Sequence, residues 1–384
     1  MKLSHWALAS LAAVPFTANA FETRLNGFIS VGAGMTLQKD QELITDPVNY
    51  GTYDNELSIK PDTMVAIQTL SKVNDRLSAT AQLTGFAGND FDVNFEWAYI
   101  NYELTNDIDV KAGRIRMPVF SYSSSLDLGY SYVWIRPPAE VYNVFLTNLE
   151  GVSADYNLLL GDWYTTASVY FGETSGTDPE TQSFVEFESI LGGSLTLNNG
   201  NLSLRGSYSV DENVTANRPV YSSALETAAP YTGGYMVMEV DLPVSFTSAS
   251  AIYDNGTFLL NSEYTYTKFI NDANNNETAW FATTGLRVGD FTPHVTYSSF
   301  KQSDNSTTTL PELDGYPYPI AVKDYAHDIS AITAGVRWDF DIAASAKIEY
   351  TTRTDSTKEP TGLDGKWSPY GDAQAISVAV DVVF

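Results

Sequence analysis

Residues 373–384, the last twelve of the chain, read A-Q-A-I-S-V-A-V-D-V-V-F. A β-strand turns successive side chains to opposite faces, so even-numbered and odd-numbered residues lie on different sides. One face is apolar, with Ile376, Val378, Val380, Val382 and Phe384, and the other is mixed and small, with Ala375, Ser377, Ala379, Asp381 and Val383. This alternation predicts a strand with one face in an apolar medium. That medium is either a lipid bilayer or, for the edge strand of a soluble sandwich, a protein core.

The beginning of the chain favours the bilayer. Residues 1–20 have the features of a signal peptide: Lys2 is positively charged, residues 6–16 are mostly apolar, and Ala18-Asn19-Ala20 fits a cleavage site. No later stretch approaches the roughly 20 apolar residues of a membrane-spanning helix. We therefore expect residues 21–384 to form strands that face lipid on one side and a water-filled lumen on the other. Because a membrane tolerates no open sheet edge, these strands must close into a ring.

The composition restricts both chemistry and partners. The chain has no cysteine, which excludes disulfides and thiol chemistry. Its net charge is −26, or −26 − 1 = −27 without Lys2, whereas a nucleic-acid binder carries a basic surface, so we expect no nucleic-acid partner. The 24 tyrosines and 7 tryptophans suit the interfaces between membrane and water. The acidic surface either binds divalent cations that bridge to lipopolysaccharide or is a halophilic or marine adaptation.

Turn signals predict the number of strands. Asn, Asp and Gly tolerate the positive φ angles of tight hairpins. Seven such clusters lie between strand-like runs: Asn74-Asp75, residues 105–107, Gly161-Asp162, residues 198–201, residues 254–256, Gly289-Asp290 and residues 339–341. Eight longer polar stretches alternate with them, at about 38–54, 86–90, 116–148, 172–182, 211–240, 270–276, 302–326 and 354–371. Seven turns and eight loops join sixteen strands, and short turns at one end with long loops at the other are typical of bacterial outer-membrane barrels.

Individual runs alternate as the last strand does. In residues 91–101, one face carries Phe91, Val93, Phe95, Trp97 and Tyr99, and the other carries Asp92, Asn94 and Glu96. Residues 202–210 and 332–340 likewise place charged side chains on their second face. Charges on that face indicate that it is wet, and a sixteen-strand barrel is wide enough to hold an aqueous channel. The sequence thus predicts an all-β fold, a transmembrane antiparallel β-barrel of about 16 strands.

The loop at residues 116–148 is the longest and the most unusual. It is too aromatic for a freely solvated loop, with Tyr122, Tyr130, Tyr132, Trp134 and Tyr142. These side chains need a surface to pack on, and the inner wall of the barrel is the nearest one. We therefore expect this long third loop to fold into the lumen and constrict the pore.

Two segments around this loop resemble a known family. The runs V-K-A-G-R-I-R-M-P (110–118) and S-Y-V-W-I-R-P-P-A-E-V-Y (131–142) resemble the third-loop region of the Gram-negative outer-membrane porin superfamily. Within it, the likeness is closest to the branch that includes the phosphate-selective porins. The resemblance implies a homotrimeric channel for passive diffusion and no particular solute. Phosphate-selective members have several lumen lysines, whereas this region offers three arginines and one lysine.

The expected constriction has six charged candidates: Lys111, Arg114, Arg116, Asp127, Arg136 and Glu140. Arginine is always charged and presents a planar fork that suits carboxylates and phosphates. Opposed to Asp127 and Glu140, the arginines could set up a transverse field in the pore. Alternatively, Arg136 and Glu140 fasten the loop to the wall. Simple alternation would turn Arg114 toward lipid, which a bulge at Gly113 or the end of the membrane zone would relieve.

Five more positions complete the predicted site. Arg205, Arg337, Lys347 and Glu349 are expected to face the lumen, where they either meet solute or pair across strands. Phe384, the terminal aromatic residue, is similar to the sorting signal of outer-membrane barrels, which makes it the expected assembly signal.

Catalysis is not expected. After the signal only His294 and His327 remain, and both are interpreted as structural. No Cys or His cluster indicates a metal and no glycine-rich loop indicates a nucleotide, so we expect no cofactor. Three functions stay open: a diffusion porin in the outer membrane for small hydrophilic solutes and ions, a substrate-specific channel for organic anions or sugars, and a non-conducting structural or adhesive barrel.

Overall fold

The computed structural model describes most of the chain. The described residues are 22–46, 51–143, 147–177, 184–221, 235–270, 274–303, 308–310, 320–322, 326–357 and 371–384. The predicted signal peptide, residues 1–20, lies outside them and stays a prediction.

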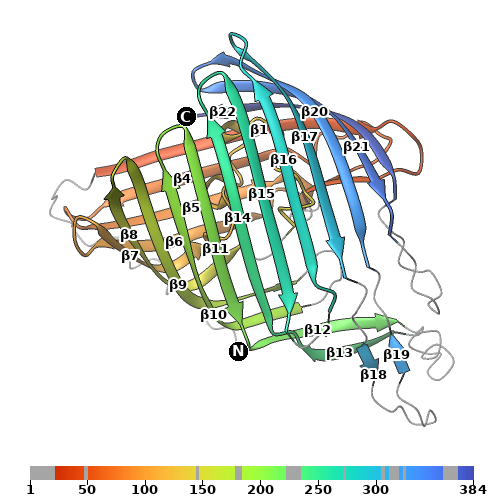
Figure 1. Ribbon diagram of the computed structural model, residues 1–384, viewed down its shortest axis with the longest axis horizontal. Coiled ribbons are helices and arrows are strands. Elements are labelled where there is room, and N and C mark those ends of the chain that lie inside the picture. Colours follow the sequence, from red (N-terminus) through yellow and green to blue (C-terminus); the bar gives the residue numbers. More distant parts are fainter. Residues whose placement is uncertain are drawn as a thin grey trace, which may run out of the picture.

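Sixteen antiparallel strands form a closed barrel (Figure 1). In ring order they are β1 (Glu22–Thr36), β4 (Met64–Lys72), β5 (Leu77–Phe86), β6 (Val93–Glu103), β7 (Ile108–Arg116), β8 (Asn148–Leu160), β9 (Trp163–Thr177), β10 (Phe184–Asn198), β11 (Leu202–Asp211), β14 (Val244–Asp254), β15 (Phe258–Phe269), β16 (Glu277–Leu286), β17 (Phe291–Gln302), β20 (Asp328–Asp341), β21 (Ala344–Asp355) and β22 (Ala373–Val383). Strand β22 pairs with β21 on one side and with β1 on the other, which closes the ring. The predicted fold class and strand number are confirmed.

The C-terminal residue sits on the seam between the first and last strands. Val380 pairs with Val31, and the backbone of Phe384 exchanges two hydrogen bonds with Gly27, at 2.8 and 2.9 Å. A Cβ at position 27 would lie 2.6 Å from the Phe384 ring, so the ring occupies the space that glycine leaves. The end of the chain is therefore fitted to the beginning of β1.

The two faces of β22 are as predicted. Val380 and Val378 are 42% and 44% exposed on the outer surface, whereas Ala379 and Asp381 are only 3% and 2% exposed inside. Exposed apolar and aromatic side chains recur around the ring, among them Val152, Phe171, Tyr264, Trp280, Val295 and Trp338. An outer face of this kind is stable in lipid rather than in water.

Most of the short turns lie where Asn, Asp and Gly predict them. The exception is the last one, expected at residues 339–341. Strand β20 continues through Asp341, and the register with β21 shifts between Trp338 and Asp341. The turn itself is formed by Ile342 and Ala343. The residues expected to form the hairpin turn, 339–341, thus lie in a β-bulge at the end of β20.

The long loops contain strands of their own. The first loop holds β2 (Leu43–Asp46) and β3 (Gly51–Tyr53), the fifth holds β12 (Val214–Tyr221) and β13 (Tyr235–Asp241), and the seventh holds β18 (Thr308–Leu310) and β19 (Ile320–Val322). Strand β12 also pairs with β10, so it extends the sheet beyond the ring. The described helices are the 3₁₀ turns η1 (Ala87–Asn89), η2 (Ser123–Ser125) and η3 (Gly129–Ser131). None of the described helices is long and apolar enough to cross a membrane.

Strand β6 departs from the predicted alternation. Gln82 pairs with Trp97 while the next residue, Leu83, pairs with Phe95, so Glu96 is an extra residue in β6. Phe95 and Trp97, expected on one face, therefore lie on opposite faces. Of the two ways considered to relieve the outward turn of Arg114, a bulge at Gly113 is not observed, since β7 keeps its register with both neighbours. Gly113 instead has a φ of +131°, and a Cβ there would lie 2.4 Å from the Ala98 carbonyl oxygen.

Candidate channel constriction

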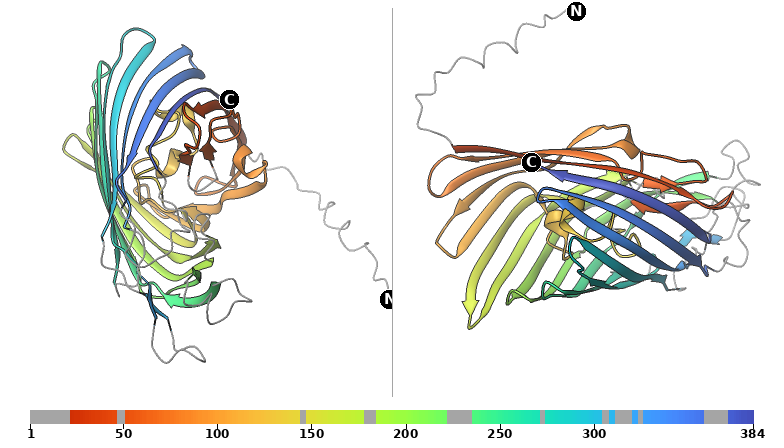
Figure 2. Two further views of the ribbon diagram at one scale, coloured as in Figure 1. Left: turned by 90° about the vertical axis from the view of Figure 1, so that its right-hand side faces the viewer. Right: turned by 90° about the horizontal axis from the view of Figure 1, so that it is seen from above.

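The described part of the third loop, residues 117–143 and 147, folds into the lumen as predicted, where Figure 2 (left) shows segments of the chain inside the ring of strands. Its aromatic residues form a buried core with the wall. The Trp134 and Phe281 rings lie 5.3 Å apart in an edge-to-face arrangement, and Phe120 packs 4.6 Å from Tyr142 and 5.4 Å from Phe246. Such ring pairs stabilise beyond the apolar area that they bury. This part of the lumen is therefore packed like a protein interior.

Hydrogen bonds fasten the loop to the inner face of β11 to β22, here called the packed wall. The packed-wall residues that form hydrogen bonds with the third loop are Arg205, Ser207, Ser248, Ser250, Asn261, Glu263, Thr296, Ser298, Arg337, Lys347 and Glu349. Tyr142 donates to Glu263 at 2.5 Å and Trp134 donates to Thr296 at 2.7 Å. A buried polar group without a partner is costly, so each of these contacts also satisfies a wall residue.

The four residues expected to face the lumen all bind the third loop. Arg205 donates to the Pro118 carbonyl. Arg337 donates to the carbonyls of Tyr130 and Tyr132, both at 2.7 Å. Lys347 donates to the carbonyls of Gly129 and Trp134 and lies 2.9 Å from Asp381. Glu349 accepts from the Ile135 amide at 2.9 Å and lies 3.6 Å from the ring of His294. These contacts hold the loop in place.

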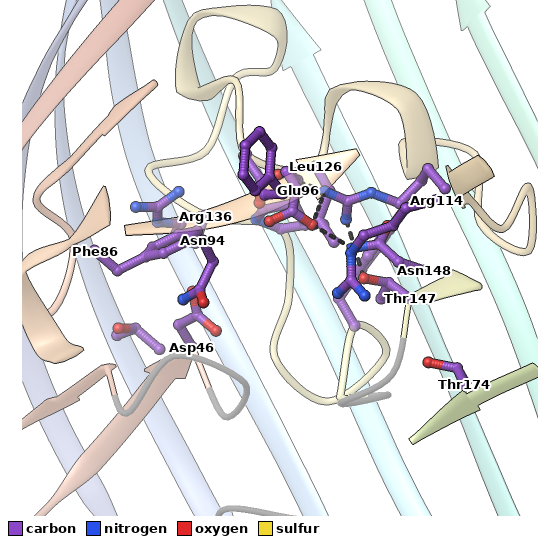
Figure 3. A pocket seen from close by; sticks show the side chains of 16 residues that line it. Asp46, Phe86, Asn94, Glu96, Arg114, Leu126, Arg136, Thr147, Asn148 and Thr174 are labelled. Atoms are coloured by element: carbon purple, nitrogen blue, oxygen red, sulfur yellow. Dashed lines mark hydrogen bonds and ion pairs between the residues drawn. The ribbon is translucent and has the colours of Figure 1, made fainter. Parts of the chain in front are cut away.

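A pocket of about 410 Å³ remains between the third loop and the inner face of β5 to β9, here called the open wall (Figure 3). The open wall contributes Phe86, Asn94, Glu96, Arg114, Arg116, Asn148 and Thr174, the third loop contributes Leu126, Asp127, Arg136, Pro137, Tyr142 and Thr147, and the first loop contributes Thr45 and Asp46. Three arginines and three carboxylates line it, so their formal charges cancel. Pockets of this volume accommodate small solutes.

Arg116 is the centre of the charged lining. Its guanidinium lies 2.6 Å from Glu96 and 2.5 Å from Asp127 and stacks 5.4 Å from the Trp97 ring. Glu96 also accepts from Asn148, at 2.7 Å. Arg116, Glu96 and Asp127 are here called the Arg116 cluster. Since one arginine pairs with two acids, this cluster carries a formal charge of −1 when both acids are ionised. It joins the third loop to the open wall.

The Asp127 carboxyl has an altered acidity. Burial raises the pKa of Asp127 to about 6, and although Arg116 opposes the rise, Glu96 adds to it. The charge of the Arg116 cluster therefore changes in the mildly acidic range.

Arg114 and Lys111 take part in pairs across the strands. Arg114 lines the pocket and pairs with Glu150, directly opposite on β8. Lys111 pairs with Asp155 at 2.8 Å and does not line the pocket. The structure thus brings Arg114, but not Lys111, to the candidate constriction.

Arg136 and Glu140 both make fastening contacts. Arg136 donates to the Met64 sulfur and to the Asp62 carbonyl, at 3.0 and 3.2 Å, and also borders the pocket. Glu140 accepts from Ser298 on the packed wall at 2.8 Å. Asp127 and Glu140 therefore do not face the arginines together from across a pore, since Asp127 is bonded directly to Arg116.

Sequence reasoning missed two contributions to the site. The alternation predicts a wet face for Glu96 but no role, because its contact with Arg116 depends on the bulge in β6. Thr45 and Asp46 belong to the long polar stretch at about 38–54, where no site residue is predicted, yet they border the pocket. Within the described residues, no group of three or more His, Cys, Asp or Glu side chains could hold a metal ion.

Comparison with known proteins identifies structures with a similar fold. No family model matches the sequence, and no curated protein matches it either. The structure is similar to the outer-membrane channel DcaP of Acinetobacter baumannii, with a TM-score of 0.59 and 11% identity over 96% of this chain and 99% of that one. It is also similar to OmpT of Vibrio cholerae, with a TM-score of 0.56 and 13% identity over 96% of this chain and 99% of that one. An anion-selective porin of Comamonas acidovorans has a TM-score of 0.55 and 14% identity over 95% of this chain and 100% of that one.

At these identities the likeness establishes the fold, which is that of the Gram-negative outer-membrane porins. The predicted resemblance to that superfamily is thus confirmed for the fold. The closer relation to the phosphate-selective branch stays a prediction.

Proposed function

We propose that the protein is an outer-membrane porin through which small hydrophilic solutes and ions diffuse, and that it is not an enzyme. The observation that carries the proposal is the charged pocket between the third loop and the open wall, inside a closed barrel with an apolar outer face. Charged residues at a constriction select among the ions that pass it. Arg114, Arg116, Asp127 and Arg136 are its proposed constriction residues, whereas the contacts of Lys111 and Glu140 suit pairing and fastening.

Balanced charge favours a general channel over a phosphate-specific one. A phosphate site would show an excess of donors over carboxylates. Here Arg116 is shared by two acids, and Arg114 and Arg136 each have an acidic neighbour, Glu150 and Asp62. A substrate-specific channel for organic anions or sugars is the second candidate, favoured by the aromatic and apolar residues Phe86, Leu126 and Tyr142 in the same pocket.

Reversal potentials in a planar bilayer under a salt gradient test the proposal. Arg114→Ala and Arg116→Ala should each shift ion preference toward cations, since each removes a positive charge from the pocket. Arg76→Ala is the matched control, because Arg76 is exposed in the short turn between β4 and β5. A wild-type barrel that folds but never conducts would support the non-conducting, structural barrel instead. Competition of sugars or organic anions with the ion current would support the substrate-specific channel.

Assembly and location belong to the same proposal. OmpT of Vibrio cholerae is known in a trimer form, and we propose that this chain is likewise a homotrimer in the outer membrane, in contact with lipid and lipopolysaccharide. The fit of Phe384 on Gly27 supports its role as the assembly signal. Deleting Phe384 should lower the yield of folded barrel in outer-membrane fractions, and an unchanged yield would exclude that role.

A further inference from the structure

The hairpin β2–β3 of the first loop lies inside the barrel. Leu43 is buried in one cluster with Ala373 and Ala375, which lie on the inner face of β22. Tyr53 is completely buried. An external hairpin would leave both side chains in water, so this one is packed against the lumen wall.

The wall under the hairpin is shaped to receive it. On the inner face of β1, a Cβ at Gly34 would lie 2.8 Å from the Tyr53 ring, and a Cβ at Gly32 would lie 2.4 Å from the Asp62 Cβ. Contacts under 3.0 Å are incompatible with a real side chain, so glycine at both positions makes room for the first loop. The neighbouring strand β22 adds the small residues Ala373 and Ala375.

A buried carboxylate fastens the hairpin to the third loop. Asp62 is 1% exposed and accepts from the hydroxyls of Tyr53 and Thr45, at 2.8 and 3.2 Å. The Arg136 guanidinium approaches Asp62 from the third loop, with Nε 3.6 Å from the carboxylate. A buried carboxylate needs such partners to offset its lost hydration. The two loops that enter the lumen are therefore held to each other.

The hairpin also borders the pocket. Figure 3 shows Asp46 of β2 at the edge of the pocket, near Asn94 of the open wall and Arg136 of the third loop. The pocket thus has three sides: the open wall, the third loop and the hairpin.

We propose that the first-loop hairpin is a second, fixed element of the constriction, whose Asp46 contacts passing solute and which limits solute size together with the third loop. This inference rests on the proposed channel function. The passage is then narrower than one bordered by the third loop alone, so it restricts sugars by size. The carboxylate of Asp46 attracts cations that enter it.

Cysteine modification tests the position of the hairpin directly, because the chain has no cysteine of its own. Asp46→Cys places a thiol on the hairpin, and Asn94→Cys places one on the open wall. Asp75→Cys is the matched control, exposed in the short turn between β4 and β5. Water-soluble methanethiosulfonate reagents are added to single channels in a bilayer. Conductance should fall stepwise for Asp46→Cys and Asn94→Cys, recover with dithiothreitol, and stay constant for Asp75→Cys.

The outcomes separate the two proposals. If no variant conducts before modification, the proposed channel function fails. If Asn94→Cys is blocked while Asp46→Cys is labelled without any change in current, the channel stands and the hairpin is not part of its constriction.

Solute size gives a second, independent measurement. Asp62→Ala removes the carboxylate that Tyr53, Thr45 and Arg136 share, so it should loosen the first loop and raise the entry rate of trisaccharides relative to monosaccharides in liposome swelling. Asp155→Ala is the matched control, because Asp155 pairs with Lys111 away from the pocket. An Asp62→Ala barrel that folds and keeps the wild-type ratio of rates would overturn the size-limiting role.

Discussion

The packed wall and the open wall use charged residues in different ways. On the packed wall, Lys347 and Arg337 donate to loop carbonyls and are almost fully covered. On the open wall, Arg114 and Arg116 border a pocket, and Arg116, which is also largely covered, pairs with Asp127 of the third loop as well. The difference teaches that a charge on a lumen-facing strand position does not by itself mark a solute path. Whether a cavity remains beside the charged group decides whether that group can meet a solute, as Arg116 can while it also holds the third loop.

The largest effect is expected on the packed wall. Lys347→Met leaves Asp381, which is 2% exposed, without its cation and frees the carbonyls of Gly129 and Trp134. Removing one partner of a buried ion pair costs about 3–5 kcal/mol. Urea unfolding of the barrel in lipid measures this loss. Lys111→Met is the control, and its loss should be smaller because Lys111 is partly exposed beside Asp155. Equal losses would mean that the two walls do not differ in packing.

The outer face should not distinguish the two walls. Val380 lies behind the packed wall and Val152 behind the open wall, and they are 42% and 49% exposed. An arginine facing lipid near mid-membrane costs roughly 2–4 kcal/mol. Val380→Arg and Val152→Arg should therefore destabilise the barrel in lipid by similar amounts. Unfolding free energies check this, and a neutral Val380→Arg would mean that the faces of β22 are reversed.

Local chemistry made much of this fold predictable. The alternation of the last strand and the Asn, Asp and Gly turns depend on residues close in sequence, and they yielded both faces of β22 and the sixteen strands. The aromatic excess of residues 116–148 predicted that this loop lies in the lumen, because such side chains require a partner surface. The turn after β20 was misplaced because a bulge and a turn draw on the same residue types.

The candidate site was less predictable, since it depends on contacts between distant segments. Nothing in the local pattern shows that Glu96 is an extra residue, so its contact with Arg116 was missed. The position of the first loop did have a signal. The small inner face of the last strand, with Ala373 and Ala375, together with Gly34 on β1, leaves room for another segment. The sequence does not show which segment fills that room.

A pH dependence is expected from the Arg116 cluster, which joins Asp127 of the third loop to the open wall. The pKa of Asp127 is about 6, so lowering the pH through that value neutralises a carboxylate while Arg116 keeps its charge. Preference for anions should therefore rise between pH 7 and pH 5. The pKa of Asp127 in the folded barrel lies above the ordinary value of about 3.9. Protonation of Asp127 therefore adds to the free energy of unfolding, fully below pH 4, and this contribution is lost as the pH rises through 6. Reversal potentials at several pH values check the selectivity change.

Asp127→Asn is the control for this titration. It should give the low-pH selectivity at all pH values without the step near pH 6. A step that persists in this variant would assign the titration to another group.

The smallest effect is expected at the end of the open wall far from the pocket. Strand β8 begins at Asn148, which lines the pocket, and ends at Leu160, beside the turn with Asp162. At about 3.3 Å per residue, Asp162 lies roughly 40 Å away along the strand. The Debye length at physiological salt is about 8 Å, so the charge of Asp162 is screened from the pocket. Asp162→Asn should leave the reversal potential unchanged, whereas Asp46→Asn, which removes the same charge at the pocket itself, should shift it toward anions. If Asp162→Asn shifted it as far, selectivity would depend on the net charge of the barrel rather than on the residues that border the pocket.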